Sequence, residues 1–145
     1  MRGKCLCGEI EFELHGDVPN LYQCHCSLCR KVTGSAANAA FRIGADQFAW
    51  ISGSVLIREF VTESGFKSHF CATCGSPVPN LTGNDSAYWI PAGLLEDSSE
   101  LELVAHLYVA SRAAWDVIAD VGEQFDEMPD TEALDGLLQP AKSVT

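Results

Sequence analysis

The seven cysteines of this chain fall into three close groups, and these groups are the residues most able to do chemistry. The groups are Cys5 and Cys7, then Cys24, Cys26 and Cys29, then Cys71 and Cys74. Cysteines spaced as Cys-x-Cys or Cys-x-x-Cys can point their sulfurs at one ion without straining the backbone, as tetrahedral zinc requires. A lone Cys-x-x-Cys would be equally typical of a redox pair. Three such groups between residues 5 and 74 therefore indicate metal binding.

The number of thiols predicts how they are shared. Seven cysteines can fill one four-cysteine site, which is closed and structural, and leave three ligands for a site that keeps a position for water or substrate. Cys24, Cys26 and Cys29 lie in one short segment, predicted to be a loop, and are the natural three-ligand set for a catalytic zinc. The two distant pairs would then close the structural zinc site and join the first strand to a remote turn.

Spacing alone leaves two other arrangements open. A single zinc could be bound, with the three remaining cysteines reduced and buried. Alternatively, Cys24, Cys26 and Cys29 could share an ion with one cysteine from another group, which would give two differently filled sites. The arrangement with two zinc ions is favoured because it keeps each pair together.

Polar residues beside the three-cysteine segment are candidates for substrate contacts. Arg30 and Lys31 follow it directly and could attract an anionic thiol, although ordinary surface charge explains them as well. Ser35 could hydrogen-bond near the site or simply belong to the loop. His25 lies between two ligands, so its ring is expected to point away from the ion, in a structural role or as an outer donor or proton relay. His106, within a predicted strand, is interpreted as a packed residue.

Composition limits the class of protein. A chain of 145 residues and 15.7 kDa fits a single domain over residues 1–145. With 47% hydrophobic and 20% charged residues it is neither disordered nor fibrous. Its net charge of −11 disfavours partners such as nucleic acid or an anionic membrane. No apolar run reaches the roughly 20 residues of a membrane helix, and no export signal is visible, so we expect a cytoplasmic protein.

Short alternating segments separated by turns predict an all-β architecture. Glu9–Leu14 alternates charged and apolar residues with period two, as a half-buried strand does. Another strand is expected to begin at Leu21. Further strands are expected over residues 35–43, 48–50, 54–62, 66–70, 88–90 and 103–109.

The C-terminal part differs, because residues 113–141 contain no Lys or Arg and many acidic residues. Thr131 is predicted to cap a short helix that runs to Leu138 and is halted near Pro140. The acidic stretch is interpreted as a solvated surface, with contact to a basic partner as the alternative.

Taken together, the cysteine motifs resemble the glutathione-dependent formaldehyde-activating enzyme family, which also includes centromere protein V. The likeness extends from about Gly3 to Pro129. The segments that carry it are Gly3-Lys4-Cys5-Leu6-Cys7-Gly8, Cys24-His25-Cys26-Ser27-Leu28-Cys29-Arg30, Thr33-Gly34-Ser35, Phe70-Cys71-Ala72-Thr73-Cys74-Gly75 and Ala105-His106-Leu107-Tyr108-Val109, followed by Ser111-Arg112, Trp115 and Gln124-Phe125-Asp126.

The resemblance implies a β-tent fold of several small sheets and two zinc ions. Cys5, Cys7, Cys71 and Cys74 would hold a structural zinc, and Cys24, Cys26 and Cys29 a catalytic zinc whose loading can be partial. The family's name-giving activity joins formaldehyde to glutathione and is classed as that of a carbon–sulfur lyase. Since fold transfers more safely than substrate, a non-catalytic zinc-binding interaction module and a metal or thiol sensor remain alternatives.

Overall fold

The computed structural model describes residues 1–140, and over these residues the all-β prediction is confirmed. Several small sheets are accompanied by two short helices, α1 (Ser27–Thr33) and α2 (Thr131–Leu138), and by single turns of 3-10 helix. The chain groups into two compact units. Unit 1 combines residues 1–16 with 42–99, and unit 2 combines residues 17–41 with the chain from Glu100 onward. A single domain over 1–145 stays a prediction.

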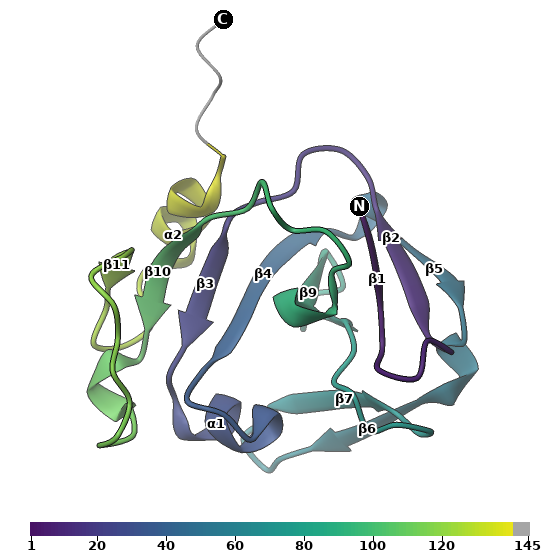
Figure 1. The fold of residues 1–145 in the computed structure, drawn as a ribbon, viewed down its shortest axis with the longest axis horizontal. Helices are drawn as coiled ribbons and strands as arrows, with labels where there is room; N and C mark the ends of the chain where they lie inside the picture. Colours follow the sequence, from purple (N-terminus) through teal and green to yellow (C-terminus); the bar gives the residue numbers. More distant parts are fainter. Residues whose placement is uncertain (141–145) are drawn as a thin grey trace, which may run out of the picture. The chain divides into compact units, whose positions relative to one another are not determined.

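Unit 1 contains one three-stranded antiparallel sheet and two hairpins. The sheet has the order β1-β2-β5, and one hairpin pairs β6 with β7 (Figure 1). The other hairpin pairs β8 with β9. The strands are β1 (Arg2–Lys4), β2 (Glu11–Leu14), β5 (Phe48–Ser52), β6 (Ile57–Val61), β7 (Lys67–Cys71), β8 (Asn80–Leu81) and β9 (Ala87–Pro91).

Aromatic packing holds the three-stranded sheet. As the alternation predicts, β2 buries Phe12 and Leu14, while its glutamates stay partly exposed. The Phe12 ring stacks on Phe48 with ring centroids 5.6 Å apart and meets Trp50 edge-on at 6.3 Å. The strand predicted over 54–62 begins later than expected, because Gly53 takes a left-handed conformation and starts a 3-10 turn over Ser54–Leu56.

Unit 2 is built on strands in the order β11-β10-β3-β4, of which the first three lie side by side in Figure 1. Both β3 and β11 run parallel to β10, whereas β4 is antiparallel to β3. The chain enters unit 1 along β4. The strands are β3 (Leu21–Cys24), β4 (Asn38–Gly44), β10 (Leu103–Leu107) and β11 (Glu123–Gln124).

Three further local predictions need correction. The three-cysteine segment is a strand end followed by helix α1 rather than a loop, since Cys26 caps the helix and Gly34 ends it in a left-handed conformation. The cap of α2 is Asp130, whose carboxylate accepts the N–H of Ala133 at 3.1 Å, and not Thr131. The strand predicted to reach Val109 ends at Leu107.

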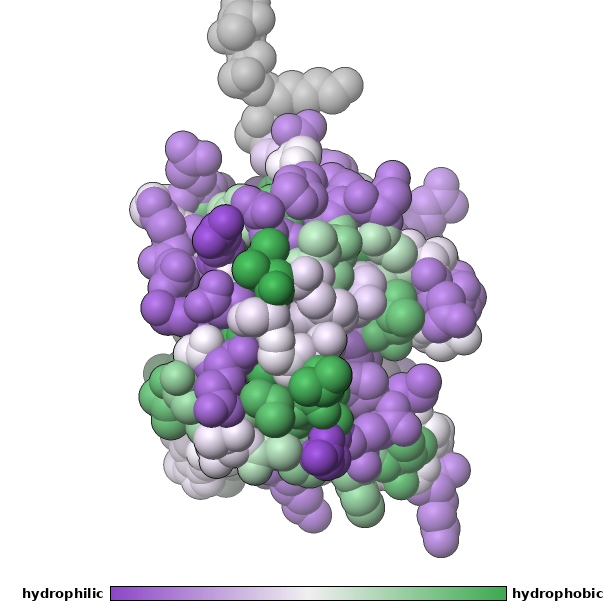
Figure 2. All heavy atoms as spheres, turned by 90° about the vertical axis from the view of Figure 1, so that its right-hand side faces the viewer, coloured by the Kyte–Doolittle hydropathy of each residue, from purple (hydrophilic) through white to green (hydrophobic). Residues whose placement is uncertain are grey.

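The surface carries scattered apolar residues. Figure 2 shows hydrophobic residues on one face as small patches interrupted by hydrophilic ones. Among the described residues, no helix has both the length and the apolar composition that crossing a membrane requires.

Candidate metal centres

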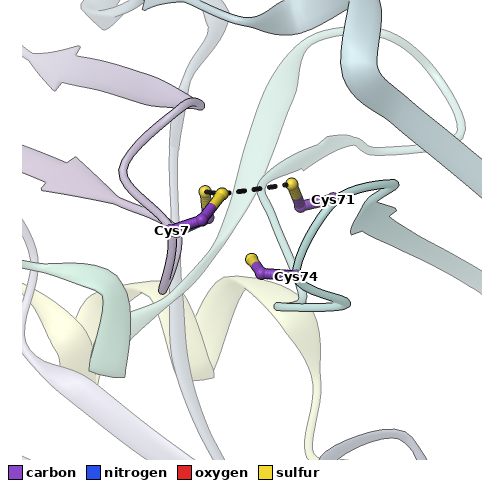
Figure 3. Close-up of side chains that lie close together, drawn as sticks. Cys7, Cys71 and Cys74 are labelled. Carbon is purple, nitrogen blue, oxygen red and sulfur yellow. Dashed lines mark hydrogen bonds between the residues drawn. The ribbon is translucent and has the colours of Figure 1, made fainter.

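Four cysteine thiols meet in unit 1. Cys5 follows β1, Cys7 lies two residues later, Cys71 ends β7 and Cys74 occupies the turn after it. Their four sulfurs lie within 4.8 Å of one another, with 3.4 Å between Cys5 and Cys7 and 3.8 Å between Cys7 and Cys71. Figure 3 shows Cys7, Cys71 and Cys74 turned toward one another from two segments of the chain.

The turns that begin at Cys5 and at Cys71 are each closed by a glycine. The N–H of Gly8 donates to the Cys5 carbonyl at 3.0 Å, and the N–H of Gly75 donates to the Cys71 carbonyl at 2.8 Å. Both glycines have positive φ, 80° and 76°, which a residue with a Cβ rarely adopts. Ser76 links the two turns, because its hydroxyl accepts the N–H of Leu6 at 2.9 Å. The local sequence thus shapes both turns so that their thiols converge.

Three further thiols meet in unit 2 at the junction of β3 and α1. Cys24 is the last residue of β3, Cys26 caps α1 and Cys29 lies in its first turn. The N–H of Cys29 donates to the Cys26 sulfur at 3.4 Å, and the N–H of Arg30 donates to the Cys26 carbonyl at 3.0 Å. The three sulfurs lie within 4.8 Å of one another; Cys24 and Cys29 are buried and Cys26 is half-buried.

Both clusters fit the dimensions of a metal–thiolate centre. Four ligands at the usual Zn–S length of about 2.3 Å stand about 3.8 Å from one another in a tetrahedron. The sulfur separations of 3.4 and 3.8 Å and the common limit of 4.8 Å agree with this spacing. Both clusters could therefore hold metal ions. The described Cys, His, Asp and Glu residues add no fourth ligand atom to Cys24, Cys26 and Cys29.

Thiol acidity differs within the three-cysteine cluster. The hydrogen bond from Cys29 to the Cys24 sulfur lowers the pKa of Cys24 to about 6. The same bond, together with burial, raises the pKa of Cys29. Burial and the nearby thiolates of Cys24 and Cys26 also raise the pKa of Tyr108, which keeps its phenol protonated. Cys24 is therefore the thiol of this pair that ionises first.

The four-cysteine cluster shows a similar asymmetry. Hydrogen bonds from the hydroxyl and N–H of Ser76 lower the pKa of Cys74 to about 6. At Cys7, the N–H of Glu9 favours the thiolate, but desolvation and the neighbouring thiols outweigh it and raise the pKa to about 12.

His25 points its ring at two partners, neither of which is a metal-ligand candidate. Its Nδ1 lies 2.7 Å from Oδ2 of Asp116, and its Nε2 lies 3.0 Å from Nδ1 of His106. The side chains of His25 and Asp116 are 2% and 8% exposed, and His106 is 2% exposed. Sequence reasoning missed Asp116, which is one of many acidic residues in its region, and treated His106 as packing alone.

The predicted substrate residues lie on and just after α1. Arg30 donates from its guanidinium to the Ser111 carbonyl at 3.3 Å. Lys31 and Ser35 are exposed, and the N–H of Ser35 donates to the Thr33 hydroxyl at 3.3 Å. Substrate contacts for all three stay predictions.

Two further residues beside the cluster were not predicted. Asn38 pairs in register with Cys24 across β3 and β4 and is 4% exposed, and its Nδ2 has no hydrogen-bond partner among the described residues. Tyr108, directly after β10, has a left-handed backbone with φ 55°. A non-glycine residue in this conformation costs about 1 kcal/mol or more, and such strain clusters at functional sites.

A cavity of about 230 Å³ in unit 1 contains no cysteine. Phe66, Lys67 and Trp89 are among its lining residues, and none of the predicted site residues belongs to it.

This chain is a protein of small β-sheets with two clusters of converging thiols. The cysteines of both clusters are able to bind metal ions. The model of the family described as glutathione-dependent formaldehyde-activating enzyme matches residues 1–111, so the chain belongs to that family. The fold is similar to a structural-genomics crystal structure of a Rhodobacter sphaeroides protein, with a TM-score of 0.56 and 22% sequence identity. The alignment covers 68% of this chain and 91% of that one. No curated protein matches the chain significantly.

Proposed function

We propose that this protein is a zinc-dependent carbon–sulfur lyase that acts on a small thiol adduct such as S-hydroxymethylglutathione. The observation that supports this most is the cluster of Cys24, Cys26 and Cys29, whose sulfurs converge without a fourth ligand from the described residues. Such a site leaves a coordination position for a substrate. Family membership supports glutathione and formaldehyde as the reactants.

The two clusters would have different tasks. Cys5, Cys7, Cys71 and Cys74 would hold a structural zinc, and Cys24, Cys26 and Cys29 the catalytic one. A zinc ion in the second site would lower the pKa of a thiol that binds at its remaining coordination position. Seven unpaired cysteines also suit a reducing compartment, so we place the protein in the cytoplasm.

The reaction itself needs only a proton transfer and one carbon–sulfur bond. In the cleavage direction that bond breaks, its electron pair stays on sulfur, and the hydroxyl loses its proton as the carbonyl forms. In the reverse direction the thiolate attacks the carbonyl carbon and the oxygen gains a proton. Tyr108, whose raised pKa keeps it protonated, would donate a hydrogen bond to this oxygen. Arg30 and Lys31 would attract the carboxylates of glutathione.

Removal of one ligand tests the proposal. The zinc-loaded chain should speed the equilibration of formaldehyde with glutathione above the spontaneous rate, as followed by NMR. Cys26→Ser should abolish this acceleration and keep the fold. Leu28→Ala, which changes a partly exposed residue of the same helix, should leave the rate unchanged. If the zinc-loaded wild type accelerates the reaction with neither glutathione nor other small thiols, the proposal is wrong.

A second candidate is a non-catalytic zinc-binding interaction module. Trp115 and Val117, which are 69% and 91% exposed, favour it because large apolar side chains on a surface often serve a partner. Three thiolates also make a zinc ion electron-rich and blunt its activation of a fourth. In this case added glutathione would leave the spectrum of a Co²⁺-substituted three-cysteine site unchanged, whereas a lyase site would respond. A metal or thiol sensor would respond too, but its metal content would vary with supply.

A further inference from the structure

We propose that Asp116, His25 and His106 form a hydrogen-bonded brace that fixes the three-cysteine segment in its metal-binding conformation. All three side chains belong to unit 2 and come from different segments. His25 lies between two of the cysteines, His106 lies on β10, and Asp116 lies on the following loop. The inference rests on the metal-binding part of the proposed function and not on the lyase reaction.

The brace is a continuous row of three short contacts. Asp116 Oδ2 lies 2.7 Å from His25 Nδ1, His25 Nε2 lies 3.0 Å from His106 Nδ1, and His106 Nε2 lies 2.7 Å from the Val121 carbonyl oxygen. Neighbours of Asp116 on the loop point outward, since Trp115 and Val117 are exposed, whereas the Asp116 side chain is 8% exposed. Between these two exposed neighbours, the Asp116 side chain therefore turns inward.

Every ring nitrogen of the row has a partner. The Val121 carbonyl can only accept, so His106 Nε2 donates to it. His25 Nδ1 and Nε2 face Asp116 and His106, so neither ring leaves a buried nitrogen unpaired. A buried polar row whose members are all hydrogen-bonded avoids the cost of unsatisfied buried groups.

The loop that carries Asp116 and Val121 is seated on β10 by a glycine. A Cβ at Gly122 would stand 2.9 Å from the backbone of Val104, and Gly122 has φ 87°. The absent side chain and the positive φ together let the loop approach closely enough for the Val121 carbonyl to reach His106.

The brace acts on the cysteines through the backbone of His25. The N–H of His25 donates to the Leu107 carbonyl at 2.9 Å, and its ring contacts His106, the residue before Leu107. Main chain and side chain of His25 are thus both anchored to β10. Because Cys24 and Cys26 flank His25, the anchor sets the directions of their thiols before an ion arrives. Outer residues that orient ligands typically alter metal affinity about 10- to 100-fold.

Three variants separate the hydrogen bond from the charge. Asp116→Leu removes the partner of His25 Nδ1 and should weaken zinc binding at the three-cysteine site about 10- to 100-fold. Asp116→Asn keeps the shape of the side chain and can still hydrogen-bond to His25 Nδ1 without a charge, so it should stay within about threefold of the wild type. Asp120→Leu, a change at an exposed position of the same loop, is the control and should have no effect.

Zinc transfer from the loaded full-length chain to a chromogenic chelator measures the affinity, with the four-cysteine site as internal reference. Unchanged affinity in a folded Asp116→Leu protein would overturn the proposal. Equal losses in the Asn and Leu variants would also overturn it, because charge would then matter rather than the hydrogen bond. If the Leu variant does not fold, nitrogen-15 NMR of the wild type decides. We expect slowly exchanging ring N–H protons on His25 and His106, and their absence would contradict the brace. None of these readouts depends on lyase activity.

Discussion

Tyr108 combines a left-handed backbone with a raised side-chain pKa beside the three-cysteine cluster. Its left-handed backbone is strained, and burial together with the thiolates of the three-cysteine cluster raises the pKa of its phenol. The proton is consequently retained to a higher pH than in a free tyrosine. Tyr108→Phe should keep the fold and lower the lyase rate of the zinc-loaded chain by roughly 10²-fold, the lower end of the cost of removing one hydrogen-bond donor to a reacting oxygen.

The matched control for this residue is Tyr88→Phe. The Tyr88 ring stacks on Phe48 in unit 1 with ring centroids 3.8 Å apart, so its substitution should leave the rate unchanged. Equal rates for Tyr108→Phe and the wild type would remove Tyr108 from the mechanism while leaving the zinc site intact.

Strand β1 and helix α2 each contain one glycine. Substitution of these two glycines should change the free energy of unfolding in opposite directions. A Cβ at Gly3 would stand 2.3 Å from the Phe12 ring, which is buried and held by Phe48 and Trp50. Gly3→Ala should therefore lower the free energy of unfolding by about 1–3 kcal/mol. Gly136 lies in α2 with open space around it, so Gly136→Ala should raise that free energy by about 0.5–1 kcal/mol. Denaturant unfolding of the metal-loaded chain measures both, and two changes of the same sign would refute this account.

Most strands could be predicted from the sequence, because period-two alternation and turn residues report burial directly. Helix α1 could not, since its cap is a cysteine, a residue not typical of that position, although Gly34 offered a signal for its end. Both cysteine clusters follow from counting and spacing. The partners of His25 do not, because Asp116 is 91 residues away in sequence and resembles its exposed acidic neighbours until the loop is folded. Long-range side-chain pairing of this kind leaves no local pattern.

For the molecule as a whole, the two clusters should respond differently to loss of metal. The four-cysteine cluster joins segments 64 residues apart, so its ion contributes to the folding of unit 1. The three-cysteine cluster lies within one strand–helix junction that backbone hydrogen bonds already hold. Cys71→Ser should therefore disturb the fluorescence of Trp50 and Trp89, which both lie in unit 1, whereas Cys26→Ser should not. A similar disturbance in both variants would show that the two ions are equally structural.

The sulfur of Cys26 combines two tasks, because it accepts the N–H of Cys29 in the first turn of α1 and also faces the other thiols. Serine is among the best residues for starting a helix, while its neutral hydroxyl is a poor ligand for zinc compared with a thiolate. Replacing this sulfur with oxygen should therefore separate the helix cap from the metal ligand. The first turn of α1 would still form, but the site would lose one thiolate ligand.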